Sequence, residues 1–484
     1  MKKSLINNAL FNVLYRMLNV FFPLITSMYV SRVLLSSGIG KVAYAQNIVQ
    51  YFIIFASLGI PTYGAREIAK VRDSKSAYSK VFWELFVING LATLGCILAY
   101  YTFVFVSPMF NATRTLNCVV GIVLTLNFFN IDWFYQGQEE YKYIALRSCI
   151  IKIVSLCSIF AFVKTQSDFI VYAAIQSFAT AGNYVFNFIH LKRYINRPVA
   201  NFDFKRHMKP VLILLSSTIA VELYTLLDTT MLGYLCTDSI VGYYTNSVKL
   251  VKMITTFISA ISAVLLPRLS YYYGNGEKKL FDQVISTSTK MMIWITIPCS
   301  IGLFFVSDSV ITLFFGQDFA PAISITKILC ILIFAISLNN LFGTQILVTV
   351  GKEKLLLVSV MAGAITNLIL NSILIPRIQA NGAALASAAS EVVVLLFTFV
   401  FALKNVKFAF DRPFFTSLLF SACGMTFSLI VGNHIMCKIG VSDLINTVFM
   451  VLIGIISYVA IGFCTHNCVL QQMISILKRK VVKK

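Results

Sequence analysis

Charged residues are scarce in this sequence, and acidic residues are scarcer than basic ones. Only 12% of the 484 residues are Asp, Glu, Lys or Arg, with 19 acidic residues against 40 basic ones. A soluble domain carries about 25% charged residues, so the composition excludes an ordinary soluble fold. Mean hydropathy is +0.82, and the apolar residues, 58% of the chain, come in long blocks. This pattern is typical of an integral membrane protein.

Histidine is also rare, and the motifs of common enzymes are missing. Four histidines, and cysteines that mostly lie inside apolar runs, give no basis for a metal site. The sequence has no Walker A, GxSxG, HExxH or Asp-rich metal motif. The net charge of +21 is explained by basic cytoplasmic loops rather than by a nucleic-acid partner. We therefore predict a protein that is not an enzyme, with no catalytic residues, no cofactor and no metal.

The apolar runs are long enough to cross a bilayer as helices. A span needs about 20 mostly apolar residues, and helices satisfy their own backbone groups in lipid. The sequence predicts an all-α polytopic membrane protein with about fourteen transmembrane helices. We expect these helices at 9–33, 38–60, 81–106, 116–136, 144–163, 168–190, 211–235, 240–266, 289–307, 322–349, 355–375, 381–403, 414–433 and 443–465.

The positions of the basic residues predict the orientation. With the N-terminus in the cytoplasm, 29 of the 40 Lys and Arg fall in cytoplasmic segments, 6 on the opposite side and 5 inside helices. Basic residues are enriched in the cytoplasmic loops of membrane proteins. This bias predicts that both termini lie in the cytoplasm.

A weak internal repeat divides the chain. GKV at 40–42 opens the second predicted helix, and GYY at 242–244 opens the eighth, 202 residues later. Repeats of this kind build many transporters. Together with the basic segment after the sixth helix, the repeat predicts a six-helix bundle at 1–190, a basic cytoplasmic linker at 191–210, a second six-helix bundle at 211–403, and an additional helix pair with a basic tail at 404–484.

Polar residues form stripes along the first two helices of each predicted bundle. Such stripes on facing bundles predict a water-filled cleft between them. The first stripe includes Asn12, Arg16, Asn19 and Thr26; the second Gln46, Gln50 and Ser57; the seventh helix carries Thr218, Glu222, Thr225 and Thr229, with Asp228 beside them; the eighth carries Thr245, Lys249, Lys252, Thr256 and Ser259.

The buried lysines of the eighth helix can be read in two ways. The acidic residues of the seventh helix, Glu222 and Asp228, could neutralise them, or the lysines could await an anionic ligand. Lys249 and Lys252 stand three residues apart on one helix and repel each other. That repulsion favours a dianionic ligand such as phosphate or pyrophosphate.

Three further cations have open roles. Lys152 and Lys327 lie inside predicted helices and either snorkel, pair with an acid or contact the same ligand. Arg66 belongs to a basic loop after the second helix. We expect it to serve membrane topology or to gather an anionic headgroup at the cytoplasmic surface.

Four stretches resemble the polysaccharide transporter family of the MOP superfamily, the O-antigen and capsule flippases. They are SRVL at 31–34 with GIGKVA at 38–43, LGI at 58–60 with YGAREIA at 63–69, DWFYQGQE at 132–139, and LDTTMLG at 227–233. The resemblance extends along essentially the whole chain. It implies two six-helix bundles with two added helices, and alternating access that flips an undecaprenyl-pyrophosphate-linked oligosaccharide in a bacterial cytoplasmic membrane.

The resemblance also implies roles for the polar residues. Arg16, Lys249 and Lys252 would hold the pyrophosphate, with Arg66 and Lys327 as further substrate contacts. Sugars would meet the side chains of Asn19, Gln46 and Gln50. Glu222 and Asp228 would bind a coupling proton or sodium ion. Expected partners are the lipid-linked oligosaccharide, membrane lipid, and a polysaccharide polymerase with other assembly proteins.

Three other functions stay open on the sequence. The first is a flippase for a lipid-linked peptidoglycan or teichoic-acid precursor. The second is an ion-coupled, MATE-like exporter of small molecules, although exporters of cations usually have acidic cavities and this cleft is predicted to be basic. The third is a polymerase or ligase acting on lipid-linked sugars, which the short loops on the outer side disfavour.

Overall fold

The structure is a computed structural model that describes residues 5–196, 202–263, 265–409, 411–439 and 442–472. Side chains are left undescribed for residues 5–21, for several positions within 217–224 and 260–267, and at 437. Helix makes up 89% of the structure, and the described residues contain no strand. The prediction of an all-α fold is confirmed.

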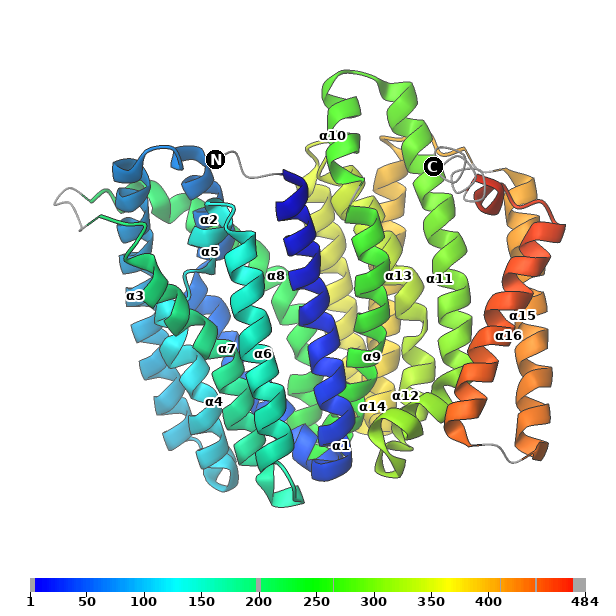
Figure 1. Cartoon of the computed structure of the whole chain (residues 1–484), viewed down its shortest axis with the longest axis horizontal. Coiled ribbons are helices and arrows are strands. Elements are labelled where there is room, and N and C mark those ends of the chain that lie inside the picture. Colours follow the sequence, from blue (N-terminus) through cyan, green and yellow to red (C-terminus); the bar gives the residue numbers. More distant parts are fainter. Residues whose placement is uncertain (1–4, 197–201, 264, 410, 440–441, 473–484) are drawn as a thin grey trace. The chain divides into compact units, whose positions relative to one another are not determined.

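Residues 1–245 form one compact unit. Within it α1 packs against α3, α4, α6 and α8, and α4, α6 and α7 lie side by side (Figure 1). The elements of this unit are α1 (Leu5–Ser57), α2 (Ile60–Val71), α3 (Lys75–Val106), η1 (Pro108–Thr113), α4 (Arg114–Leu126), η2 (Asn127–Phe129), α5 (Asp132–Gly137), α6 (Tyr141–Phe162), η3 (Gln166–Asp168), α7 (Phe169–Leu191), α8 (Lys205–Leu235) and the first turns of α9 (Asp238–Ala263).

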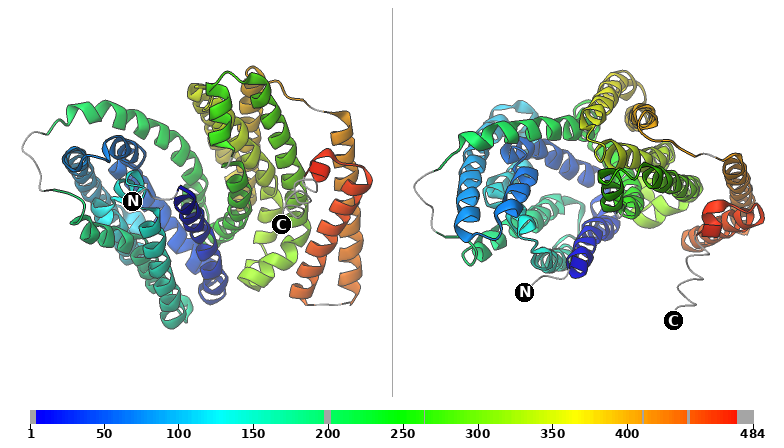
Figure 2. Two further views of the ribbon diagram at one scale, coloured as in Figure 1. Left: turned by 45° about the horizontal axis from the view of Figure 1, so that its top comes forward. Right: turned by 90° about the horizontal axis from the view of Figure 1, so that it is seen from above.

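Residues 246–484 form the second compact unit. In it α15 and α16 are neighbours and pack on α11 (Figure 2), where the Tyr458 hydroxyl donates to the Trp294 carbonyl at 3.0 Å. After the rest of α9 come α10 (Leu266–Gly274), α11 (Lys278–Phe315), η4 (Gln317–Phe319), α12 (Ala322–Leu329), α13 (Ile331–Asn339), the π-helix η5 (Asn340–Leu347), α14 (Glu353–Leu403), α15 (Arg412–Ile439) and α16 (Asp443–Cys464).

Nine helical segments of the described chain are long and apolar enough to cross a membrane. Each predicted span coincides with helix over most of its length. Two of the long helices hold two predicted spans each. The backbone leaves helical geometry at Leu35 in α1, and at Ile378 and Gln379 in α14, which are the positions predicted as turns between spans.

The predicted helix at 116–136 is continuous in the sequence pattern but interrupted in the structure. α4 ends at Leu126, and α5 begins only at Asp132. Between them the Asn130 amide donates to Asn127 Oδ1 at 3.1 Å. Asn side chains compete with the helical backbone for hydrogen bonds, which explains a break inside an apolar run.

The division between the two compact units falls within α9, after Thr245. α8 packs on α1 and α2 and is therefore part of the N-terminal unit. The predicted grouping into two six-helix bundles with a linker and an added pair, and the cytoplasmic position of both termini, stay predictions.

An aromatic core joins α2, α3 and α5. Trp133, Phe134 and Tyr135 of the DWFYQG stretch are all nearly inaccessible. Phe82 of α3 stacks on Trp133 with ring centroids 5.6 Å apart and meets Phe134 edge-on at 5.4 Å. The stretch is therefore a packing motif that fixes the short α5 against α3.

The segment between α7 and α8 is attached to α3 at both ends. At its start the indole of Trp83 donates to the Asn196 carbonyl at 3.0 Å. At its end the Asp203 amide donates to Glu84 Oε1 at 2.8 Å. Because α8 begins at Lys205, the predicted linker 191–210 includes the first turns of a helix.

Glu84 is the centre of a buried polar cluster. Its carboxylate is inaccessible to solvent, and so is nearly all of His207. Glu84 Oε2 lies 2.5 Å from Arg206 Nη2 and 2.9 Å from His207 Nε2. The other ring nitrogen of His207 bonds the Tyr63 hydroxyl at 2.9 Å. The start of α8 is thus bonded to α2 and α3 through a charged group that water does not reach.

Candidate functional site

Two cations of α9 have no acidic partner among the side chains that the structure describes. Lys249 is half-buried and donates to Asn246 Oδ1 at 3.4 Å, and Lys252 is exposed. Among the described side chains, no carboxylate lies within ion-pair distance of either lysine. The hydroxyls of Thr255 and Thr256 donate to the backbone carbonyl of Lys252. Both ammonium groups can therefore donate hydrogen bonds to an anionic ligand.

The two acidic residues of α8 differ in their surroundings. Asp228 is buried and accepts a short hydrogen bond from the Tyr244 hydroxyl. Glu222 is half-buried, and its Oε2 is 3.5 Å from the Thr225 hydroxyl. Asp228 is thus set among hydrogen-bond partners, whereas Glu222 has a single weak one among those described.

Two glutamines of α1 lie next to its contact with α8. Gln46 is exposed and Gln50 half-buried. The neighbouring Asn47 and Tyr51 point instead at α8, where both bond the Thr230 hydroxyl at 2.7 Å. The two amides are therefore on a different face from the helix contact. Arg16 and Asn19, the other predicted site residues of α1, have side chains outside the described part of the chain.

Lys327 of α12 has an acidic partner that its sequence position does not reveal. Its Nζ is 2.9 and 2.8 Å from the two carboxylate oxygens of Asp308 on α11, and it lies over the Phe304 ring at 5.7 Å. The carboxylate of Asp308 therefore neutralises the ammonium group of Lys327. Lys152 lies over the Phe22 ring at 5.7 Å.

Arg66 has an exposed side chain on α2. Its side chain is 60% exposed, with Nε 3.9 Å from Glu67 Oε1 and the guanidinium over the Tyr63 ring at 5.8 Å. Lys70 is the closer partner of Glu67, at 2.7 Å. An exposed arginine whose acidic neighbour is shared remains available to an anionic headgroup.

The sequence analysis missed a buried ion pair. Arg147, near the start of the predicted helix 144–163, is only 6% exposed and donates from Nη2 to Asp132 Oδ1 at 2.9 Å. Its Nε donates to Asn183 Oδ1 at 3.0 Å, and Asn187 donates to the same carboxylate. The pair joins α5, α6 and α7. The available signal was an acid at the start of one helix and an arginine near the start of the next.

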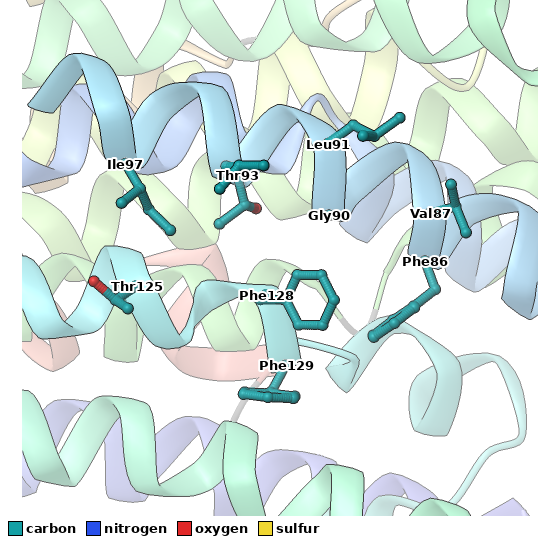
Figure 3. A pocket seen from close by; sticks show the side chains of 10 residues that line it. Phe86, Val87, Gly90, Leu91, Thr93, Ile97, Thr125, Phe128 and Phe129 are labelled. Carbon is teal, nitrogen blue, oxygen red and sulfur yellow. The ribbon is translucent and has the colours of Figure 1, made fainter.

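Two apolar cavities accompany the polar residues. One of about 490 Å³ lies between α3 and the α4–η2 segment, where Thr93 and Ile97 point toward Thr125 and Phe128 (Figure 3). The other, of about 510 Å³, is lined by α9, α11, α15 and α16, including Trp294. Neither is lined by a predicted site residue, so these cavities suit hydrocarbon rather than a charged headgroup.

Comparison with known proteins places the chain in a family. Residues 5–273, more than half of the chain, match the family described as polysaccharide biosynthesis protein. The chain belongs to the polysaccharide biosynthesis protein family. Residues 214–373 also match the MatE family. The predicted resemblance to polysaccharide transporters of the MOP superfamily is confirmed.

Relatives of this chain include a protein named as a transporter and one named as a flippase. The chain is 23% identical over 407 residues to a protein of Escherichia coli (strain K12) named as an O-antigen transporter, covering 84% of this chain and 98% of that one. It is 22% identical over 426 residues to the lipid II flippase MurJ of Bacillus subtilis (strain 168), covering 76% of each. The protein is therefore a multi-pass membrane transporter.

A solved structure shares the fold. The lipid II flippase MurJ in an inward closed conformation superposes with a TM-score of 0.72 at 15% identity, covering 99% of this chain and 100% of that one. Identity this low shows the fold and leaves the substrate to be argued from the residues.

Proposed function

We propose that this protein flips an undecaprenyl-pyrophosphate-linked oligosaccharide across a bacterial cytoplasmic membrane by alternating access. The product would supply O-antigen, capsule or a related surface polysaccharide. The observation that supports this most is the lysine pair of α9, because neither ammonium group has an acidic partner among the described side chains. The relative named as an O-antigen transporter supports the same substrate class.

The energetics favour an anionic ligand at these lysines. A charged side chain at the centre of a membrane helix costs about 2.5–3.5 kcal/mol on insertion scales. Lys249 and Lys252 also repel each other across one helical turn. A hydrogen bond to a charged group contributes about 1.5–3 kcal/mol, so two contacts to a pyrophosphate offset most of the cost of both cations.

Other polar residues would complete the headgroup site. Arg16 would add a third cation, and the amides of Asn19, Gln46 and Gln50 would bond sugar hydroxyls. Arg66 would gather the headgroup at the cytoplasmic surface. Since Lys327 is matched by Asp308, we leave it out of this set. We propose no catalytic role for any of these residues, because the reaction moves the substrate without breaking bonds.

Coupling to an ion gradient would use the acidic residues of α8. Glu222 has few described partners and is the better candidate to take up a proton or sodium ion, while Asp228 already accepts from Tyr244. Replacing Glu222 by Gln would then remove the dependence of transport on that gradient, measured in energised vesicles. Transport that keeps its ion dependence in this variant would exclude Glu222.

A second candidate substrate is the peptidoglycan precursor lipid II, which the likeness to MurJ favours. Teichoic-acid precursors share the same phosphate chemistry. Complementation of strains that are depleted of the flippase for each substrate distinguishes the lipid-linked oligosaccharide, lipid II and the teichoic-acid precursor.

An exporter of small cations fits less well, because the lysine pair would repel its cargo. A polymerase and other assembly proteins would act next to this protein on the flipped product.

The test replaces the lysines one at a time and together. Lys249→Gln and Lys252→Gln remove the charge and leave a polar side chain that is one bond shorter. Lys404→Gln, at an exposed lysine after α14, is the matched control. We expect surface polymer to fall by about tenfold or more in the double variant, the equivalent of losing one charged contact. Normal polymer at normal protein level in the double variant would exclude the proposed pyrophosphate site.

A further inference from the structure

The cavity between α3 and the α4–η2 segment lies where the fourth predicted span is interrupted, and part of its wall is aromatic. Phe128 of η2 packs on Gly90 of α3, where an added Cβ would stand 2.5 Å from Cε2 of the ring. The same ring meets Phe86 edge-on, with centroids 4.7 Å apart (Figure 3). Contacts on two sides fix the ring, so this wall is formed before any ligand arrives.

The mouth of this cavity faces the lipid side of α3. Leu91 and Leu94 line the cavity and are 69% and 55% exposed. They belong to a helix, Lys75–Val106, that is long and apolar enough to cross a membrane. Leucines this exposed in the middle of a membrane span contact hydrocarbon, so a lipid chain can enter the cavity sideways from the bilayer.

One polar side chain in this apolar wall lacks a partner. Thr93 lines the cavity and is fully buried, and its hydroxyl has no hydrogen-bond partner among the described residues. Across the cavity (Figure 3), the Thr125 hydroxyl donates to the Gly121 carbonyl one turn earlier at 3.2 Å, which is the usual solution for a helical threonine. A buried hydroxyl without a partner costs free energy. The cavity therefore favours an occupant that offers Thr93 an acceptor.

The position of the cavity along α3 indicates a long chain. α3 lines it from Phe86 to Ile97, which is roughly 17 Å along a helix axis. Thr93 stands at the middle of the predicted span 81–106, so the cavity extends to both sides of the membrane midplane. The hydrocarbon of one leaflet is about 15 Å thick, half of the core. The acyl chain of a membrane lipid therefore ends near the midplane, whereas a much longer polyprenyl tail can pass it.

We propose that this cavity binds part of the polyprenyl tail of the lipid-linked substrate. Every isoprene unit carries a double bond, whose π electrons accept a weak hydrogen bond from the Thr93 hydroxyl. Because the units repeat, a double bond lies near Thr93 wherever the chain is positioned along the cavity, while a saturated chain offers no acceptor. A tail bound here stays in the bilayer as the headgroup crosses. The inference rests on the proposed transport of a polyprenyl-linked substrate, but not on its sugars.

The first test detects the tail at the mouth of the cavity. The photoreactive residue p-benzoylphenylalanine replaces Leu94 in the full chain, or replaces Leu98 as the matched control, which is 63% exposed on α3 but does not line the cavity. The probe is undecaprenyl phosphate in phosphatidylcholine nanodiscs, and mass spectrometry measures polyprenyl against acyl-chain adducts. We expect this ratio to be about tenfold higher at position 94, because the unpaired hydroxyl and the depth of the cavity both favour the longer, unsaturated chain. Equal ratios at the two positions would overturn the proposal.

The second test asks whether the Thr93 hydroxyl selects the double bonds. Undecaprenyl phosphate is compared with its fully hydrogenated form, and each adduct yield at position 94 is divided by that at position 98 to remove differences in photochemical reactivity. With Thr93 present, we expect hydrogenation to lower this quotient about two- to fivefold. Thr93→Val keeps the shape without the hydroxyl and should abolish the difference, whereas Thr93→Ser should retain it. The same preference in all three chains would overturn the assignment to an unsaturated chain.

Failure of the tail site and failure of the proposed function give different results. If Thr93→Val does not fold, the comparison of the two tails in the chain with Thr93 decides alone. The probe carries no sugar and crosslinking needs no transport. Export that is lost in the Lys249 and Lys252 double variant, with no enrichment at position 94, would refute the tail site and leave the flippase. Enrichment at position 94 with normal export in that double variant would refute the pyrophosphate site and support the tail site.

Discussion

Replacing Glu84 tests how strongly the start of α8 is held to the N-terminal unit. In Glu84→Gln, the amide can donate to His207 Nε2 while His207 donates from Nδ1 to the Tyr63 hydroxyl. Arg206 then loses its charged acceptor, now 2.5 Å away. In Glu84→Ala, both Arg206 and His207 lose it, together with the Asp203 amide.

The expected magnitudes follow from burial. A hydrogen bond to a charged group contributes about 1.5–3 kcal/mol. Because Arg206 is 44% exposed and can turn to water, we expect Glu84→Gln to lie near the lower value. Removing one partner of a buried ion pair costs about 3–5 kcal/mol, which we expect for Glu84→Ala. The apparent melting temperature in detergent and protease resistance of residues 202–210 measure the loss.

Glu139→Gln is the matched control. Glu139 pairs with Arg72 at 2.6 Å, about as closely as Glu84 pairs with Arg206, but its side chain is 38% exposed and that of Arg72 is 43% exposed. Exposed pairs contribute about 0–1 kcal/mol. The predicted order of destabilisation is Glu84→Ala, then Glu84→Gln, then Glu139→Gln. Equal melting temperatures for the Glu84 variants and the control would refute the argument from burial.

Two further predictions concern the N-terminal unit. Arg147→Lys keeps the positive charge beside Asp132 but loses the hydrogen bond to Asn183. We therefore expect the free energy of unfolding to fall by about 1–3 kcal/mol. A variant with no measurable loss of thermal stability would contradict the stabilising role of this buried cluster. Backbone amides of Lys164 and Thr165 hold the pKa of Asp168 below its ordinary value of 3.8. Their bonds to the carboxylate should therefore persist above pH 3.8 and be lost as pH falls through the lower folded-state pKa. Amide exchange at Thr165, corrected for intrinsic rates, checks this against Asp168→Asn, which should lack the transition.

Charge pairing was the property that the sequence left most open. In the sequence, Lys249, Lys252 and Lys327 look alike, because each is a lysine inside a predicted apolar helix. The structure gives Lys327 the acid Asp308, 19 residues earlier on another helix, and describes none for the other two. Helical spacing predicts which residues share a face, but it cannot predict which face of another helix will lie opposite.

Burial of Arg147 shows the same limit. Its position near the start of the predicted helix 144–163 indicates no partner, yet its side chain bonds Asp132 and Asn183 on two other helices. Counting charges in loops still gives a strong overall bias, because one buried arginine changes the count little. The interruption of the fourth span at Asn130 was likewise hidden, since an asparagine in an apolar run predicts no particular backbone geometry.

The positions of the helices were determined by the sequence alone, because hydrocarbon accepts only long apolar runs whose backbone bonds are internal. The 202-residue offset between Gly40 and Gly242 was also visible there. That these two glycines cross at backbone distance, and that α8 with the first turns of α9 packs in the N-terminal unit, was decided only by the tertiary structure. Contacts between helices depend on the shapes of two surfaces at once, and a single pattern along the chain carries information about only one of them.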